Sequence, residues 1–143
     1  MKTSSIIYKG DIRTEAKHNK SGQLIYTDGP TDNFGKGEAF SPTDLVATAL
    51  GCCILSIMGI AARTHEIDME GTKVDVQKTM AENPRRIVKI EVDIYMPDFD
   101  YDSRKKAILT NAAKGCPVSR SLNHEIEEVV TFHWNSSGET KSE

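Results

Sequence analysis

Residues 41–62 read SPTDLVATALGCCILSIMGIAA and carry the clearest structural signal in the chain. Ser41 is a good helix N-cap, Pro42 suits the first helical position, and Asp44 stands where the acid of a capping box stands. No charged residue follows Asp44 until Arg63, and apolar residues fall on every side of the helix. The pattern predicts a helix that is buried on all sides.

The uncharged part of this helix is just long enough to cross a membrane. Thr48, Gly51, Ser56 and Gly59 dilute its hydrophobicity, however, and no Trp or Tyr flanks it. We therefore expect the core helix of a soluble protein that has no membrane partner. One small sheet and one amphipathic helix would not cover so apolar a surface, so we also expect a homodimer.

Weaker patterns on both sides of this helix predict the other elements. We expect strands over 6–8, 24–27, 73–77, 88–96 and 129–134. We expect further helices over 103–114 and 117–122, the first with Gly115 as its C-cap and with these residues facing inward: Ala107, Ile108, Ala112 and Ala113. This order predicts an α+β fold with a mainly antiparallel sheet. It fits a single domain over residues 1–143, with a polar tail from about residue 135 that we expect to be disordered.

The composition is that of a soluble protein, with 38% hydrophobic and 27% charged residues and a net charge of −3. This charge and the dispersed basic residues argue against nucleic-acid binding. The histidines show no metal-ligand spacing and no phosphate-binding glycine loop occurs, so we expect neither a metal nor a cofactor. The first nine residues hold no signal-peptide core, and an odd number of cysteines does not fit a secreted disulfide framework. We expect a cytoplasmic location.

Two cysteines occupy contrasting positions. Cys53 lies in the middle of the long helix, where it would react only if a cation such as Arg13 were near. Cys116 precedes Pro117, which predicts that it caps a short helix whose dipole favours the thiolate. Cys52 points about 100° away from Cys53 and is expected in the core. Simple packing of a small apolar side chain is the alternative for either cysteine.

The two cysteine segments together resemble the OsmC/Ohr family of thiol-dependent peroxidases. Its first motif is a helix that starts with a proline and carries an acidic residue, about ten residues before a reactive cysteine. Residues 41–45 have this pattern and lie at that spacing before Cys53. Its second motif, Cys-Pro-(aromatic or Val)-Ser, matches residues 116–119. The order of elements agrees over about residues 4–134. The resemblance implies an intertwined homodimer, with two central helices packed against mainly antiparallel sheets and the site at the interface.

The resemblance also implies a chemical role for each cysteine. Cys53 would attack the peroxide and become a sulfenic acid, and Cys116 would resolve it as a disulfide. A dithiol such as a dihydrolipoyl group would then reduce that disulfide. This sequence of steps agrees with the known oxidation of cysteine, in which a sulfenic acid condenses with a nearby thiol.

An N-terminal arginine stabilises the reactive thiolate in this family, and Arg13 is the best match. The family's glutamate falls where this chain has Thr43, so Asp44 or Glu38 would have to partner Arg13. The Gly51-Cys52-Cys53 sequence and the long loop over 27–40 are more similar to the less characterised OsmC-like branch.

Two functions remain open at this point. The first is an antioxidant enzyme of the oxidative stress response, an organic hydroperoxide reductase that uses Cys53 and Cys116. Phe34, Phe40 and Ile57 would then form apolar walls for an alkyl peroxide. The second is a non-catalytic OsmC-like protein that binds a small apolar ligand at the dimer interface.

Overall fold

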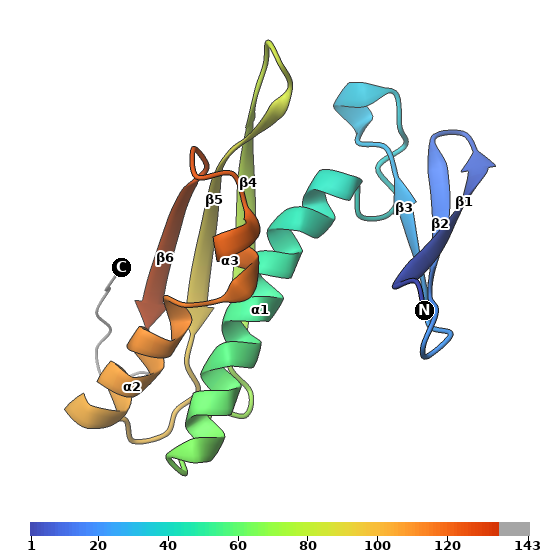
Figure 1. The fold of residues 1–143 in the computed structure, drawn as a ribbon. Coiled ribbons are helices and arrows are strands. Elements are labelled where there is room, and N and C mark those ends of the chain that lie inside the picture. The colour runs from blue at the N-terminus through green and yellow to red at the C-terminus, as the bar shows by residue number, and fades with distance from the viewer. Residues whose placement is uncertain (135–143) are drawn as a thin grey trace. The chain divides into compact units, whose positions relative to one another are not determined.

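A computed structural model describes residues 1–134, and its elements follow the predicted order of strands, helix, strands, helices and strand (Figure 1). The elements are β1 (Ser4–Gly10), β2 (Arg13–His18), β3 (Leu24–Asp28), the short 3-10 helix η1 (Thr31–Asn33), α1 (Pro42–Thr64), β4 (Lys73–Ala81), β5 (Arg86–Tyr95), α2 (Ser103–Ala113), α3 (Pro117–Ser121) and β6 (Glu127–His133). The α+β prediction is confirmed. The chain divides into two compact units, one up to Val46 and one from Ala47 onward. The predicted tail lies outside the described residues, and one domain over 1–143 stays a prediction.

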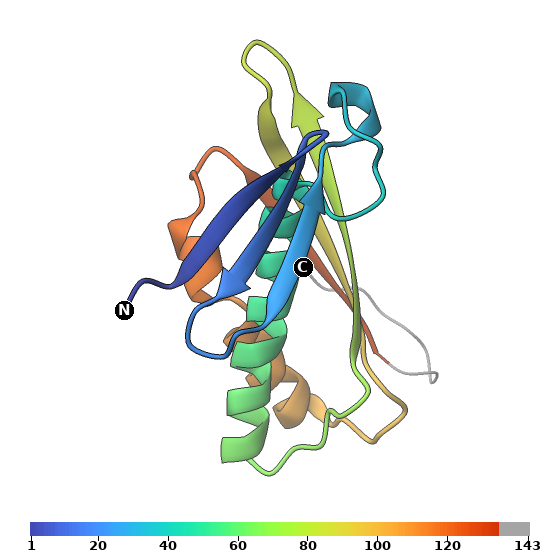
Figure 2. The same cartoon turned by 90° about the vertical axis from the view of Figure 1, so that its right-hand side faces the viewer.

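The N-terminal unit is built on a three-stranded antiparallel sheet in the order β1-β2-β3, whose strands lie side by side in Figure 2. The sequence predicted β1 and β3 only in part and missed β2. The sequence of β2, RTEAKH, has no apolar alternation, so it becomes a strand only because both neighbours pair with it. Its register places Arg13 directly opposite Asp28 of β3.

The C-terminal unit has a second sheet in the order β4-β5-β6. Strands β4 and β5 form an antiparallel hairpin around the turn at Asn83-Pro84. Strand β6 pairs with β5 in parallel. The segment that contains α2 and α3 carries the chain from the end of β5 back to the end of the sheet where β5 begins, so β6 runs in the same direction. Across both sheets, the prediction of mainly antiparallel pairing is confirmed.

Helix α1 packs one face against this sheet. Leu50, Ile54 and Met58 recur at every fourth residue and are at most 1% exposed. They meet the inward side chains of β5 and β6, which are Ile90, Val92, Ile94 and Phe132. Gly51 allows the close approach, since a Cβ there would lie 2.9 Å from Val76.

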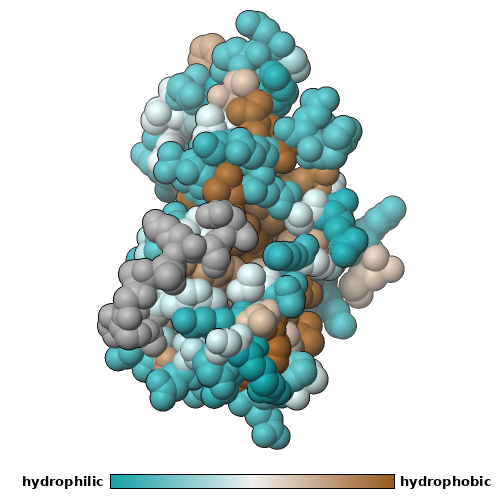
Figure 3. All heavy atoms as spheres, turned by 90° about the vertical axis from the view of Figure 1, so that its left-hand side faces the viewer, coloured by the Kyte–Doolittle hydropathy of each residue, from teal (hydrophilic) through white to brown (hydrophobic). Residues whose placement is uncertain are grey.

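The expectation that α1 is buried on all sides is wrong for the single chain. Ile60 is 63% exposed and Val46 37%, because the sheet covers only one side of the helix. By length and composition alone α1 could also cross a membrane, although the core helices of soluble proteins pass the same test. On the face drawn in Figure 3, apolar side chains reach the surface among mostly hydrophilic ones.

Helix α2 differs from the prediction in its inward face and its end. Ala113 is buried and Ile108 and Ala112 pack against the core, as predicted, but Leu109 is buried as well and Ala107 is exposed. The larger Leu109 takes the core position, which turns Ala107 outward on the helical wheel. The helix ends at Ala113 with Lys114, not Gly115, as its C-cap.

Candidate functional site

Cys53 and Cys116 come together in the C-terminal unit. Cys53, on α1, is half-buried and packs against the hydrophobic core, of which Cys116 is a fully buried member. The Cys53 side chain contributes to the raised pKa of Cys116, so the two thiols lie close enough to influence each other. Both thiols are free. Two residues 63 positions apart in the sequence therefore share one site, as two cysteines that react with each other must.

Cys116 is the N-cap of α3, as the sequence predicted. Its backbone is extended, with φ −75° and ψ 141°, and its Sγ accepts a hydrogen bond from the backbone N–H of Ser119 at 3.3 Å. Pro117 begins the helix, which fixes this geometry locally.

The predicted preference of Cys116 for the thiolate is wrong. Burial raises the pKa of the Cys116 thiol, and the neighbouring Cys53 raises it further. The N–H groups of Ser119 and Val118 lower that pKa, but by less. A helix of only five residues does not offset the loss of solvent. In the reduced protein Cys116 is therefore held as the neutral thiol beside Cys53.

The prediction that Cys52 lies in the core is also wrong, because Cys52 is exposed. Leu50 and Ile54 define the face of α1 that packs on the sheet. Cys52 follows Leu50 by two residues and is therefore rotated by about 200° from it. It lies on the opposite side of the helix from the sheet.

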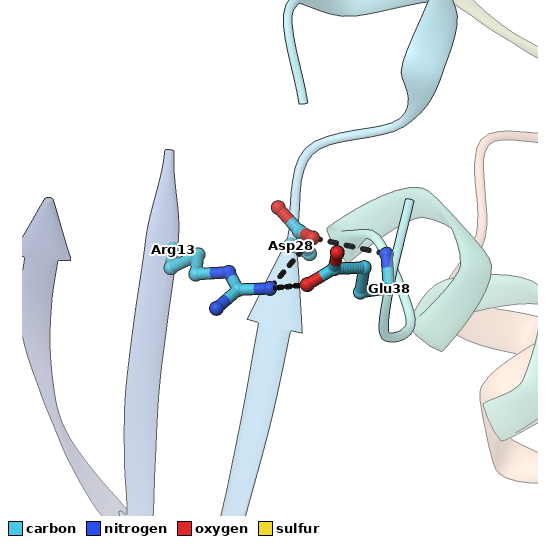
Figure 4. Close-up of polar contacts among 3 residues, drawn as sticks. All are labelled: Arg13, Asp28 and Glu38. Atoms are coloured by element: carbon cyan, nitrogen blue, oxygen red, sulfur yellow. Dashed lines mark hydrogen bonds and ion pairs between the residues drawn. The ribbon is translucent and has the colours of Figure 1, made fainter. Parts of the chain in front are cut away.

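Arg13 lies at the centre of a second cluster, in the N-terminal unit. Its Nη2 is 3.5 Å from Oδ2 of Asp28 and forms a further ion pair with Glu38 (Figure 4). The backbone N–H of Glu38 donates to the same Asp28 oxygen at 3.0 Å. Asp28, only 1% exposed, thus holds both the arginine and the loop that carries Glu38.

The charges in this cluster reinforce one another. Burial lowers the pKa of Arg13, but the carboxylates of Asp28 and Glu38 together raise it above its usual value. The hydrogen bond from the Glu38 backbone lowers the pKa of Asp28. Burial opposes this shift, whereas the Lys36 backbone and Arg13 lower the pKa further. Arg13 is a permanent cation beside two anions at neutral pH.

The loop between β3 and α1 positions Glu38 through close backbone contacts. Gly37 donates its N–H to the carbonyl of Gly29 at 3.0 Å, and Asp28 donates to the carbonyl of Phe40 at 3.0 Å. A Cβ on Gly35 would lie 1.9 Å from the oxygen of Gly29, so only glycine fits there. This loop lies within the long loop over 27–40 that the sequence analysis identified.

Glu38, one of the two acids proposed for Arg13, pairs with it. Asp44 instead closes the capping box of α1: the Ser41 N–H donates to its Oδ2 at 2.9 Å, and its own N–H donates to the Ser41 Oγ at 3.1 Å. Sequence reasoning missed Asp28. Only the register between β2 and β3, which places Asp28 opposite Arg13, could have identified it. Strand β2 itself was not predicted.

The proposed substrate residues lie in different surroundings. Phe34 is 92% exposed, Phe40 is exposed, and Ile57 is half-buried against the core of α1. A pocket of about 480 Å³ lies beside Arg13, lined by Lys9, Thr14, Tyr26, Thr27, Glu38 and Ala39 as well. The approach of Arg13 and the two phenylalanines to Cys53 stays a prediction. Within residues 1–134, no cluster of His, Cys, Asp or Glu could hold a metal ion.

The model of the family described as OsmC-like protein matches residues 35–130, which include both cysteines and Glu38. The chain belongs to the OsmC-like family.

The relatives of this OsmC-like chain support the assignment. A solved structure from Psychrobacter arcticus 273-4, named for osmotic stress induction and a detoxification response, is 47% identical. The match covers 93% of this chain and 96% of the Psychrobacter chain, with a TM-score of 0.89. An uncharacterized protein of Methanocaldococcus jannaschii is 35% identical over 81% of this chain, which spans only 61% of that relative.

More distant structures share the fold. An organic hydroperoxide resistance protein from Legionella pneumophila is 15% identical, with a TM-score of 0.71 over 92% of this chain and 97% of its own. Another organic hydroperoxide resistance protein, from Elizabethkingia anophelis, is 16% identical. That match has a TM-score of 0.72 and covers 94% of this chain and 98% of the Elizabethkingia chain. The same fold therefore occurs in proteins named for hydroperoxide resistance.

Proposed function

We propose that this protein is a thiol-dependent peroxidase that reduces organic hydroperoxides. The closeness of Cys53 and Cys116 within the core of the C-terminal unit carries the proposal. The Cys53 thiolate attacks the terminal peroxide oxygen, the O–O bond breaks, and the alkoxide takes a proton from water and leaves as an alcohol. Cys53 is then a sulfenic acid. Cys116 attacks its sulfur, a disulfide forms, and water is released.

Arg13 is the proposed electrostatic partner of the Cys53 thiolate. A fixed cation near a thiolate stabilises it and the charge that develops on the peroxide. Asp28 and Glu38 hold the guanidinium in one orientation. This acid pair takes over the role that a glutamate at the position of Thr43 has elsewhere in the family.

The proposal includes an apolar substrate site and an external reductant. Phe34, Phe40 and Ile57 are its proposed walls, which would favour alkyl peroxides over hydrogen peroxide. A dithiol, for example a dihydrolipoyl group, reduces the Cys53–Cys116 disulfide by exchange and is itself oxidised. Both electrons come from thiols, so no cofactor is needed. Free cysteines fit a reducing, cytoplasmic location.

The active form in this proposal is a homodimer. Large apolar side chains of β1 and β3 are exposed, namely Ile6, Ile7, Tyr8, Leu24, Ile25 and Tyr26. Large apolar side chains gathered on an exposed sheet indicate an interaction surface. An exposed stripe also follows α1, formed by Val46, Ala49, Cys52, Ser56 and Ile60. A second copy of the chain would cover both surfaces.

Thiol counting tests the proposal directly. Reduced protein is mixed with an excess of cumene hydroperoxide, and free thiols are then measured. Of its three thiols, the wild-type chain should lose two. Cys52→Ser, the matched control, should lose the same two, and Cys53→Ser should lose none. An unchanged thiol count in the wild-type protein would end the proposal.

A second candidate function is the binding of a small apolar ligand without catalysis. It is favoured by a groove of about 490 Å³ in the C-terminal unit, with Ile54, Val130 and Phe132 among its walls. Native mass spectrometry of the purified protein separates the two functions. A bound small molecule together with unreactive thiols would favour this alternative over the peroxidase.

A further inference from the structure

Glu128 breaks the polarity pattern of β6. Side chains alternate along a strand, and Glu128 shares its side with Val130 and the buried Phe132. In the sheet it is paired with Ile90 of β5, which is 0% exposed. A carboxylate on the core side of a sheet is costly unless it is hydrogen-bonded or solvated, so its presence calls for a partner.

That partner is Ser119 of α3. The Ser119 hydroxyl donates to Oε1 of Glu128 at 2.7 Å, and both residues line the groove of about 490 Å³, which gives the carboxylate access to solvent. Ser119 also donates its backbone N–H to the sulfur of Cys116 at 3.3 Å. One residue therefore connects the sheet with the cysteine at the start of α3.

Helix α3 has only five residues and cannot hold its own shape in water. Its first turn nevertheless has to keep the Ser119 N–H directed at Cys116. Val118 and Leu122 pack against the core, but apolar contacts do not fix the direction of an N–H group. The bond to Glu128 does, because Glu128 is anchored in the ladder between β5 and β6.

We propose that Glu128 is a positioning residue for the resolution step, acting through Ser119 on Cys116. This inference rests on the proposed peroxidase function. In that step the S–O bond of the Cys53 sulfenic acid breaks and a sulfur–sulfur bond to Cys116 forms. The thiol proton of Cys116 leaves with the hydroxide as water. The Ser119 N–H stabilises negative charge on the Cys116 sulfur while its proton leaves, and Glu128 keeps that donor in place.

Rapid-mixing kinetics with cumene hydroperoxide separates the two steps. Sulfenic acid formation on Cys53 and disulfide formation with Cys116 are followed by quenching and mass spectrometry. Glu128→Ala and Ser119→Ala should each slow disulfide formation by about tenfold. Both should leave the oxidation of Cys53 within about twofold of wild type, which also shows that the variants are folded.

Conservative and double variants distinguish positioning from a merely structural role. Glu128→Gln keeps an accepting oxygen and should restore the rate to within about threefold of wild type. The double variant Ser119→Ala/Glu128→Ala should be no slower than either single variant, since both remove the same bond. Glu125→Ala removes an exposed acid just before the same strand, so it is the matched control and should be unchanged.

Diamide, which oxidises neighbouring thiols without a peroxide, keeps this test separate from the peroxidase proposal. Glu128→Ala should slow diamide-driven disulfide formation by about tenfold as well. If peroxide leaves the wild-type thiols intact but diamide shows this defect, only the peroxidase proposal fails. Disulfide formation at the wild-type rate in Glu128→Ala, or an equally slow Glu128→Gln, would overturn the positioning role.

Discussion

Arg13 and Asp28 lie opposite each other on β2 and β3, and the guanidinium Nη2 is 3.5 Å from the buried Oδ2 of Asp28. Asp28 also accepts the backbone N–H of Glu38, the second acid on Arg13. A permanent cation is thus fixed between two carboxylates that come from different segments. The stability of this unit and the activity of the protein should both depend on this arrangement.

Removing the charge of Asp28 should change how stability depends on pH. Its pKa is lowered in the folded protein, first by the Glu38 N–H, so the carboxylate stabilises the fold above the unfolded pKa of about 3.9. That contribution is lost as pH falls through the folded pKa. Asp28→Asn should therefore be less stable than wild type at pH 7, with a smaller difference at pH 3.

Urea denaturation at the two pH values measures this effect. Asp11→Asn is the control, because Asp11 is an exposed acid of the same unit and Asn tolerates its left-handed backbone. An equal loss of stability at both pH values would show that Asp28 acts through packing and not through its charge.

Removing the charge of Arg13 should slow the oxidation of Cys53. Electrostatic donors at a reacting centre typically contribute about 100-fold or more, so Arg13→Ala should lower the rate of sulfenic acid formation by about that factor. Arg13→Lys should recover only part of it, since an ammonium cannot contact two carboxylates in the same planar geometry. Lys17→Ala, on the same strand and exposed, should have no effect. A wild-type rate in Arg13→Ala would remove Arg13 from the site.

Resolution of the sulfenic acid should be slow at low pH and accelerate as pH rises. Burial raises the pKa of Cys116, and this cause persists after Cys53 has been oxidised. The thiolate fraction that attacks therefore grows up to and beyond the usual cysteine pKa of about 8.5. Single-turnover rates of disulfide formation between pH 6 and 10 give the profile. A plateau reached below pH 7 would mean that Cys116 reacts from a thiolate already present at neutral pH.

Disrupting the exposed side of α1 should dissociate the proposed homodimer. Ile60 is 63% exposed in the single chain, and Ile60→Asp would place a charge in the interface. Analytical ultracentrifugation should show a dimer for wild type and a larger monomer fraction for the variant. The thiol of Cys52, on the same stripe, should react faster with maleimide in the variant. A monomeric wild-type protein at micromolar concentration would contradict the dimer.

The features that the sequence predicted well depend on residues close together in the chain. The capping box of Ser41 and Asp44 fixes the start of α1, and Pro117 fixes Cys116 at the start of α3. These signals need no knowledge of the rest of the fold, and the order of strands and helices follows from similar local patterns.

The features that the sequence did not predict depend on distant packing. Strand β2 has no periodic signal, so the pairing of Arg13 with Asp28 could not be foreseen. The raised pKa of Cys116 results from burial by the surrounding core, whereas the sequence showed only the helix start. Cys52 was misplaced because its exposure depends on which side of α1 the sheet covers.

Peptide mapping after oxidation tests the central claim most directly. Reduced protein is treated with one equivalent of cumene hydroperoxide, its remaining thiols are alkylated, and tryptic peptides are identified by mass spectrometry without reduction. The proposed chemistry predicts a peptide pair joined by a Cys53–Cys116 disulfide, with Cys52 alkylated. Recovery of Cys53 and Cys116 as fully alkylated thiols, or a disulfide that involves Cys52 instead, would contradict it.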